Sequence, residues 1–202
     1  MTKTKIFSIK SLSNHDFNDI ISMFSNQAIG IIPTDTIYGI AGMALNQNVV
    51  ERIYKLRHRN LAKPMIILIS SIKDLDKFSI KLNKVQNEFI KKFWPGSVSI
   101  ILPCENQKLS YLHRGTKSLA FRLAKDNFLQ NLIKKTNPLV CPSANFEGDK
   151  PAESIKEAKA YFKNKVDFYV NKGILRSESS TVVDLRNKEI NIMRQGKIKI
   201  SY

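Results

Sequence analysis

The chain has 202 residues, 43% of them hydrophobic, and 33 Lys and Arg against 17 Asp and Glu give it a net charge of +16. At roughly 150 residues per domain, this length and composition predict one globular domain and exclude a disordered chain. The longest apolar runs, such as Met65 to Ile69, are far shorter than the roughly 20 residues of a membrane span. The N-terminus lacks the apolar region of a secretory signal. We therefore expect a cytoplasmic protein without membrane contact.

The positive charge favours polyanionic partners, namely nucleotides, RNA or acidic surfaces. A second interpretation is equally open, because lysines scattered along a chain also form an ordinary solvated surface. Direct RNA contact therefore stays an alternative that charge by itself does not decide.

Metal and thiol chemistry find little support in the sequence. Cys104 and Cys141 match no metal spacing and are too few for a disulfide scaffold, so we expect two reduced core thiols. His15, His58 and His113 lie far apart and are predicted to be surface residues. The GxxxxGK[ST], GxGxxG, HExxH and GxSxG motifs are absent, as is a carboxylate pair in a candidate pocket. We assign no metal ligand and no acid/base residue.

Short β-rich runs alternate with amphipathic segments along the chain. Strands are predicted at residues 5–9, 28–33, 65–69, 97–102, 118–123, 139–142, 168–170, 181–184 and 189–194. Helical stripes are predicted from a Ser13–Asp16 capping box, across residues 49–54, across residues 85–93 before Pro95, and after a Ser154–Glu157 cap. No linker divides the chain. This alternation predicts a single α/β domain with one twisted sheet and flanking helices.

Polar clusters follow several predicted strands, and open α/β sheets bind ligands at strand ends. Residues 33–39 follow the first buried strand and form either a ligand loop or a plain turn. Residues 55–63 hold four cations, Lys55, Arg57, Arg59 and Lys63. These cations either complement a helix C-terminus or hold an anion, since arginine forks match phosphate oxygens.

Three further clusters suit a pocket. Ser118, Ala120 and Arg122 share one strand face, which is either a pocket wall or a surface with a salt bridge. Residues 141–151 run from a strand into small polar residues that leave room for a ligand, and residues 179–181 and 194–196 repeat this pattern. Trp94, at a helix stop, is predicted to be a core anchor.

Taken in order, these clusters resemble the motifs of the threonylcarbamoyl-AMP synthase family, also called YrdC-like. The matching segments are residues 33–40, 57–59 with 63–65, 94–99, 122, 143–151, 180–183 and 194–196, and the match that they define extends over essentially the whole chain. The resemblance implies one YrdC-like domain over residues 1–202 without an additional C-terminal domain. It also implies a YrdC/RibB-like fold, with a twisted, largely parallel mixed sheet and a deep basic concave cleft.

The resemblance further implies a nucleotidyltransferase that converts L-threonine, bicarbonate and ATP, with Mg²⁺, into threonylcarbamoyl-AMP and pyrophosphate. Partner proteins then transfer the threonylcarbamoyl group to the adenosine beside the anticodon of ANN-reading tRNAs. ATP, bicarbonate and the threonine carboxylate are all anionic, so cations must offset their mutual repulsion. Displacement at phosphorus is catalysed chiefly by positioning and charge neutralisation, which fits clusters without a carboxylate pair.

Motif position assigns residues to two substrates. The resemblance gives ATP the residues Arg57, Arg59, Lys63, Ser118, Ser143, Asn145, Pro151 and Arg194, with Asn145 supporting the nucleotide loop. It gives threonine the residues Thr36, Arg122, Cys141 through its backbone, and Ser180.

The chain departs from the family pattern at Asn60, Ser97, Ser99, Ala124 and Glu147, which puts affinity in question more than activity. Two other interpretations stay open. A basic RNA-binding module fits the charge but would lack the interleaved aromatic residues of a stacking surface. A related carbamoyl-transfer maturation domain is disfavoured because no CxxC repeats flank the motifs.

Overall fold

The computed structural model describes residues 4–187 and 189–201. Its strands are β1 (Lys5–Ser8), β2 (Gly30–Pro33), β3 (Tyr38–Met43), β4 (Ile66–Ile69), β5 (Val98–Pro103), β6 (Ser118–Leu123), β7 (Leu139–Val140), β8 (Phe168–Asn171), β9 (Thr181–Asp184) and β10 (Asn191–Arg194). Its α-helices are α1 (Asn14–Ser25), α2 (Gln47–Leu56), α3 (Lys84–Phe93), α4 (Ser110–His113), α5 (Asn127–Thr136) and α6 (Ile155–Phe162), and short 3-10 helices are η1 (Ile9–Ser11), η2 (Ile72–Phe78) and η3 (Gln107–Leu109).

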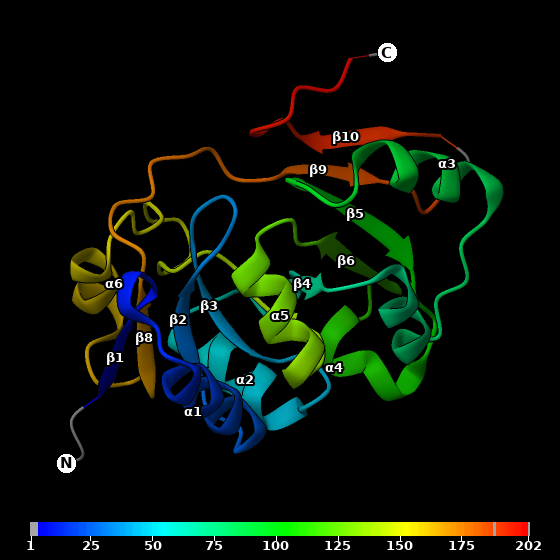
Figure 1. Ribbon diagram of the computed structural model, residues 1–202. Helices are drawn as coiled ribbons and strands as arrows, with labels where there is room; N and C mark the ends of the chain where they lie inside the picture. Colours follow the sequence, from blue (N-terminus) through cyan, green and yellow to red (C-terminus); the bar gives the residue numbers. More distant parts are fainter. Residues whose placement is uncertain (1–3, 188, 202) are drawn as a thin grey trace.

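The described strands form one sheet in the order β1-β8-β2-β3-β7-β4-β6-β5-β9-β10. Strands β2 and β8 stand upright in Figure 1, whereas β9 and β10 lie across the top, so the sheet is strongly twisted. The α/β class, the mixed sheet and the flanking helices are confirmed.

Parallel pairs do not predominate, contrary to what the resemblance implied. The pairs β1/β8, β2/β8, β4/β6 and β5/β9 are parallel, and β2/β3, β3/β7, β4/β7, β5/β6 and β9/β10 are antiparallel. The physical reason is the tight turn after β2, which returns the chain as β3 beside the strand that it has just left.

Alternate residues of the central strands pack into two cores on opposite faces of the sheet. Ile31, Ile67 and Ile69 belong to the larger core with residues of α2, α3, α4 and α6. Ile32 and Leu68 belong to the smaller core with residues of α1 and α5. Because both faces are covered, the central strands are largely buried, and their ends are left to form a site.

The predicted helix signals hold in the structure. Ser13 and Asp16 form the capping box of α1, and the Ser154 hydroxyl caps α6 by accepting from the Glu157 amide. Helix α3 ends at Trp94, which is 7% exposed and donates from Nε1 to the Val98 carbonyl at 2.7 Å, so this residue is the expected core anchor.

Two main elements and one residue differ from the sequence analysis. Strand β3 was not predicted, because both its faces are buried and its two glycines hide the alternation. Helix α5 was also missed, although Leu129, Leu132 and Ile133 have helical spacing. His113 is 2% exposed rather than a surface residue, and its Nδ1 accepts from the Gly115 amide. Both cysteines are free and buried, as predicted.

Among the described residues, no helix combines the length and apolar character that crossing a membrane requires.

Replacement of Gly30 by alanine tests the packing of the smaller core. A Cβ on Gly30 would lie 2.2 Å from the ring of Phe168, a fully buried side chain that also packs edge-on against Phe24. Such overpacking typically costs about 1–3 kcal/mol, and we expect that loss in the free energy of urea unfolding of Gly30→Ala. In the double variant Gly30→Ala/Phe168→Leu the loss should be smaller than the sum of the single losses. Strict additivity would show that the contact is not strained.

Candidate active site

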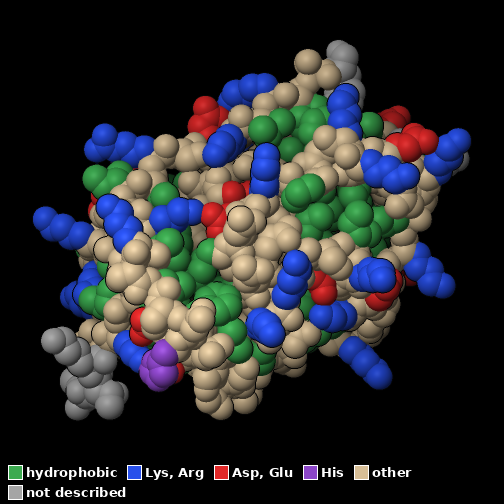
Figure 2. Space-filling model, viewed as in Figure 1, with side chains coloured by type: hydrophobic (Ala, Val, Ile, Leu, Met, Phe, Trp, Pro, Cys, Tyr) green, Lys and Arg blue, Asp and Glu red, His purple; other side chains and the backbone are tan. Residues whose placement is uncertain are grey.

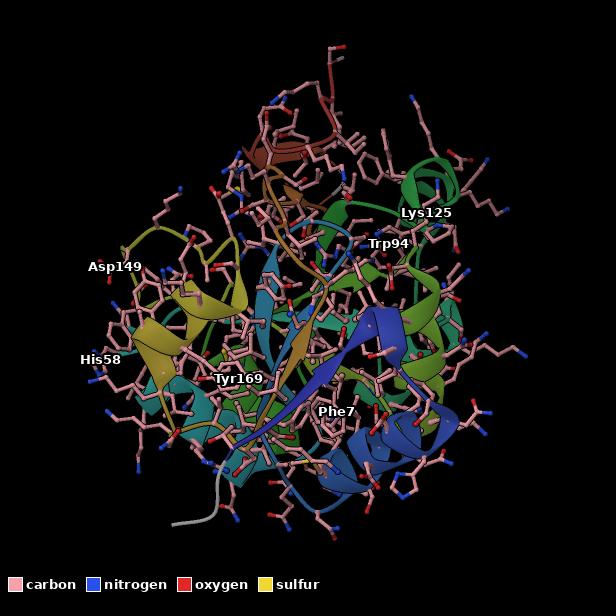
Figure 3. All side chains as sticks on the ribbon, turned by 60° about the vertical axis from the view of Figure 1, so that its left-hand side comes forward. Phe7, His58, Trp94, Lys125, Asp149 and Tyr169 are labelled. Atoms are coloured by element: carbon pink, nitrogen blue, oxygen red, sulfur yellow. The ribbon has the colours of Figure 1, made fainter. Side chains whose placement is uncertain are left out.

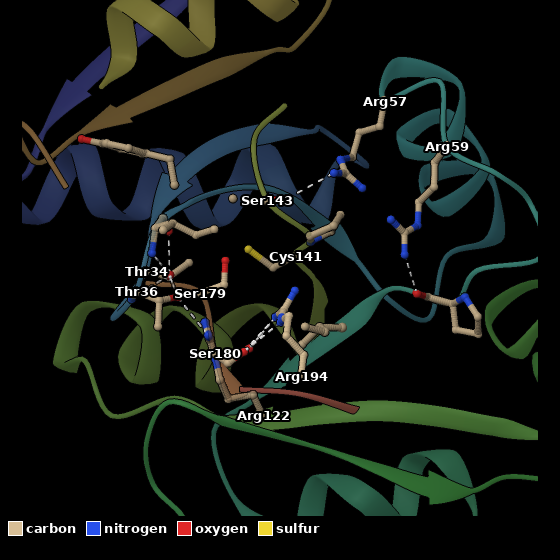
Figure 4. A pocket seen from close by; sticks show the side chains of 16 residues that line it. Thr34, Thr36, Arg57, Arg59, Arg122, Cys141, Ser143, Ser179, Ser180 and Arg194 are labelled. Carbon is tan, nitrogen blue, oxygen red and sulfur yellow. Dashed lines mark hydrogen bonds between the residues drawn. The ribbon is translucent and has the colours of Figure 1, made fainter. Parts of the chain in front are cut away.

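Residues from distant parts of the chain surround one pocket at the ends of several strands (Figure 4). Its empty volume is about 590 Å³ including the open mouth, within the usual range for small-molecule sites. The described residues that line it include four arginines and no carboxylate; they are Thr34, Thr36, Ile37, Tyr38, Gly39, Arg57, Arg59, Pro64, Ile66, Arg122, Cys141, Pro142, Ser143, Ser179, Ser180 and Arg194. The expected basic cleft is therefore present.

The turn between β2 and β3 forms one wall and is organised by Thr34. Its hydroxyl donates to the Ile37 carbonyl at 2.6 Å and accepts from the amides of Thr36 and Ile37. Since its proton is used in this way, the Thr36 hydroxyl donates to Thr34 across 3.0 Å and keeps its lone pairs for other donors. The segment is a turn, as one of the two interpretations held, and it also lines the pocket.

Arg122 on β6 reaches this turn from below the pocket. Its Nη1 donates to Thr36 Oγ1 at 3.0 Å, and its Nη2 lies 3.0 Å from Asp35 Oδ1. The side chain is 5% exposed, and its Nε has no hydrogen-bond partner among the described residues. Arg122 is therefore a pocket wall, with one ion pair to Asp35 and a donor still unused.

Arg57, at the end of α2, is held by the loop after β7. Its Nε donates to the Asn145 carbonyl at 3.1 Å, and its Nη2 donates to Ser143 Oγ at 3.2 Å and Asn145 Oδ1 at 3.3 Å. The residue is 2% exposed, and Nη1 has no partner among the described residues. Burial, followed by the nearby Arg59 charge, lowers the pKa of Arg57 to about 10, so it remains a cation at neutral pH. A buried donor of this kind is expensive unless an acceptor binds it.

Arg59 folds back onto its own loop. It donates from Nε to the Lys63 carbonyl at 3.0 Å and from Nη2 to the Pro64 carbonyl at 2.9 Å. Lys63 follows four residues later in the same loop but does not line the pocket. Its ammonium is directed to Glu147 instead, 3.1 Å from Oε1.

The strand end at residues 141–143 approaches β3 closely because residue 39 is glycine. A Cβ there would lie 2.3 Å from Cys141 Sγ and 3.1 Å from the Pro142 carbonyl oxygen. Ser143 bridges Gly39 in antiparallel fashion, which brings its side chain to the pocket. Burial raises the pKa of the Cys141 thiol to about 12, so this sulfur is a packing group and not a nucleophile.

Ser180, just before β9, and Arg194, at the end of β10, close the pocket. Ser180 is buried, and its hydroxyl lies 2.9 Å from that of Ser99. Arg194 donates to the Ser180 carbonyl from Nη2 at 2.8 Å and from Nε at 3.2 Å. Desolvation and the Arg122 charge both lower the pKa of Arg194, as expected for cations that converge on one space.

Four of the twelve residues assigned from the sequence do not line the pocket. Asn145 lies behind Arg57, Lys63 pairs with Glu147, and Pro151 lies beyond the loop that carries Ser143. Ser118 is four residues from Arg122, which in a strand is about 13 Å, and its hydroxyl bonds Thr116. The alternation of side chains along β6 predicted the correct face of the strand. It does not show how far along the strand the pocket extends.

Several lining residues belonged to the predicted clusters or matching segments but were not assigned to a substrate, namely Thr34, Ile37, Tyr38, Gly39, Pro64, Pro142 and Ser179, and Ile66 lay outside them. Most of them are neighbours of assigned residues, so position next to a motif was the available signal.

Thiol labelling tests the inert character of both cysteines. Burial raises the pKa of Cys104 as well as that of Cys141, so both thiols stay protonated at pH 8. The native protein should therefore react slowly with Ellman's reagent, and two thiols should react at once in guanidinium. Rapid modification of one thiol in the native protein would contradict the burial described here.

Comparison with known proteins finds relatives that cover most of this chain. The family model described as "Telomere recombination" (Sua5_yciO_yrdC) matches residues 22–196. The threonylcarbamoyl-AMP synthase of Pyrococcus abyssi is 28% identical over 170 residues, which are 83% of this chain and 50% of that protein. A putative threonylcarbamoyl-AMP synthase of Methanocaldococcus jannaschii is 27% identical over 203 residues, with 98% of this chain and 96% of that protein covered.

Among solved structures, Sua5 of P. abyssi complexed with L-threonine matches with a TM-score of 0.89 at 26% identity, covering 96% of this chain and 58% of that one. The chain thus spans about half the length of the P. abyssi relative and nearly all of the M. jannaschii relative. Since the family model covers most of its length, this chain belongs to the Sua5/YciO/YrdC family.

Proposed function

We propose that this chain is an L-threonylcarbamoyladenylate synthase, a nucleotidyltransferase that uses L-threonine, bicarbonate and ATP. The observation that carries the proposal is the pocket of four arginines and several hydroxyls without a lining carboxylate in the described chain. Relatives that cover most of this chain bear the name threonylcarbamoyl-AMP synthase, and one solved relative is a complex with L-threonine.

The reaction brings ATP, bicarbonate and the carboxylate of threonine together, and all three of these groups are anionic. The amine of threonine and bicarbonate form an N-carboxylate with loss of water. One oxygen of that carboxylate then attacks the α-phosphorus of ATP, and the bond to the bridging oxygen breaks as pyrophosphate leaves. Arginine donors that surround the pocket reduce the repulsion between these groups and hold them in line.

Mg²⁺ enters this proposal as part of the ATP substrate. The described lining residues offer hydroxyls and arginines but no carboxylate, so the phosphate oxygens rather than the protein would hold the ion. When bound there, it neutralises charge on the departing pyrophosphate.

On the nucleotide side, the unpartnered Nη1 of Arg57, the remaining donors of Arg59 and Arg194, and the Ser143 hydroxyl suit phosphate oxygens. Asn145 supports this side indirectly, because its carbonyl and side-chain oxygens both accept from Arg57. We assign Lys63, Pro151 and Ser118 to the same substrate by motif position.

On the amino-acid side, Arg122 suits the threonine carboxylate, and the hydroxyls of Thr36 and Ser180 suit its polar groups. These three residues line the same pocket, and Arg122 already donates to Thr36. Cys141 contributes through its backbone, because its thiol is protonated and buried.

The wider proposal is one YrdC-like domain that passes its product to partner proteins for tRNA modification. Lysines and arginines are spread over the visible face of the molecule rather than gathered in one band (Figure 2). On this face the distribution favours the solvated-surface interpretation over a dedicated RNA-binding module, and direct tRNA contact is compatible with the activity.

The first test is pyrophosphate release. With Mg²⁺, ATP and bicarbonate, the purified protein should release pyrophosphate when L-threonine is added and not before. Serine should be a poorer substrate, since one methyl group in a pocket contributes roughly 1–3 kcal/mol. Release that does not depend on any amino acid would contradict the proposal, and neither an RNA-binding module nor a maturation domain would show threonine dependence.

A second test separates the two sides of the pocket. Arg122→Lys keeps the charge opposite Asp35 but loses the planar fork, so threonine binding should weaken by roughly 1.5–3 kcal/mol while ATP binding changes little. Ser143→Ala removes a partner of Arg57 and should weaken ATP binding more than threonine binding. Calorimetry with each ligand measures both. Equal losses for both ligands in both variants would mean one shared electrostatic field instead of two subsites.

A further inference from the structure

Two loops meet at the edge of the pocket: the basic loop, residues 57–64, and the serine loop, residues 143–149. The Glu147 amide donates to the Arg57 carbonyl at 2.9 Å, and the rings of His58 and Phe146 stack with centroids 4.5 Å apart. In Figure 3 the labels of His58 and Asp149 mark these loops on the same side of the molecule. Arg57, Arg59 and Ser143 in these loops all line the pocket.

Both carboxylate oxygens of Glu147 are used by the basic loop. Oε2 accepts from the Asn60 amide at 2.5 Å, and Oε1 lies 3.1 Å from Lys63 Nζ. The Asn60 hydrogen bond and the Lys63 charge lower the pKa of Glu147, so it is ionised at neutral pH. The two oxygens therefore have different roles. Oε2 fixes the backbone of the basic loop at Asn60, and Oε1 pairs with the flexible side chain of Lys63.

Lys63 is next in sequence to a residue that lines the pocket, but its own side chain is turned away from the pocket. Its carbonyl accepts from Arg59, and the next residue, Pro64, lines the pocket. Its own side chain is 62% exposed and directed to Glu147. An ammonium on a flexible four-carbon stem reorients easily, and an exposed ion pair is weak. A polyphosphate bound by Arg57 and Arg59 would therefore compete with Glu147 for Lys63.

We infer that Glu147 is a positioning residue that withholds Lys63 from the pocket and so weakens phosphate binding, while its bond to Asn60 keeps the basic loop in place. The inference rests on the proposed function and deepens it. When a nucleotide binds, Lys63 exchanges a carboxylate for a phosphate, and when pyrophosphate leaves, Glu147 recovers the cation. Affinity for the phosphates is then set by an exchange between two anions rather than by a free lysine.

The test is calorimetry of Glu147→Gln with Mg·ATP, inorganic pyrophosphate and adenosine. Glutamine still offers an oxygen to the Asn60 amide but no longer attracts Lys63. We expect Mg·ATP and pyrophosphate to bind about two- to fivefold tighter, the range of an exposed ion pair, and adenosine to bind as in the wild type. Added salt should shrink the gain. If Glu147 only supported the fold, Glu147→Gln would bind Mg·ATP more weakly, or its affinity would change without distinguishing the charged ligands from adenosine.

Two controls isolate the pair. Glu153→Gln removes the same charge from a carboxylate that pairs with Lys150 and Arg176, and it should leave affinity unchanged. In a Lys63→Gln background, Glu147→Gln should give no gain, because the competing cation is already absent. If Glu147→Gln does not fold, Glu147→Ser, a smaller neutral replacement, tests the same pair.

The outcomes are distinct. If the wild type binds Mg·ATP and neither Glu147→Gln nor Glu147→Ser binds it more tightly, the inference is overturned and the proposed function is unaffected. Tightening that persists in the Lys63→Gln background, or that Glu153→Gln reproduces, also overturns it. Failure of the wild type to bind Mg·ATP overturns the proposed function, and the inference falls with it.

Discussion

The constraint on which the site depends is the convergence of four arginines on one pocket whose described lining contains no carboxylate. The positive charges of arginines that line one pocket repel one another. Burying a guanidinium group without partners also costs free energy. The lowered pKa values of Arg57 and Arg194 express both effects. Such an arrangement persists in a folded chain when the rest of the structure holds it in place and when an anionic ligand relieves it.

The fold holds most of these cations with neutral dipoles rather than with counter-ions. Arg57 donates to the Asn145 carbonyl, Arg59 to the carbonyls of Lys63 and Pro64, and Arg194 to the Ser180 carbonyl. A carbonyl fixes the direction of a guanidinium without cancelling its charge, so the charge remains available to a ligand. Arg122 is the exception, because it forms an ion pair with Asp35. Its Nε still has no hydrogen-bond partner among the described residues.

The polar clusters in the sequence predicted part of this site, because several of them lie at or near the ends of strands, where open α/β sheets bind ligands. Arg57, Arg122, Ser143 and Arg194, which motif position assigned to the two substrates, all line the pocket, and their roles toward each substrate stay predictions. The orientation of Lys63 was not predictable, because it is set by Glu147, which lies 84 residues away in the chain. Strand β3 was missed for a related reason: β2 and β7 flank it within the sheet, α2 and α1 contact it, and both its faces lie in the cores, so no alternation marks it.

The most direct test of the central claim is the melting temperature of the unliganded protein as tripolyphosphate is added, compared with sodium chloride at equal ionic strength. A pocket built to leave arginine charge uncancelled should bind the compact polyanion, and the melting temperature should rise with the logarithm of its concentration above the dissociation constant. Chloride should give little of this rise, and the Arg57→Gln variant should lose most of it. Equal effects of the two salts on the wild type, or an undiminished rise in Arg57→Gln, would show that the four arginines do not form an anion site.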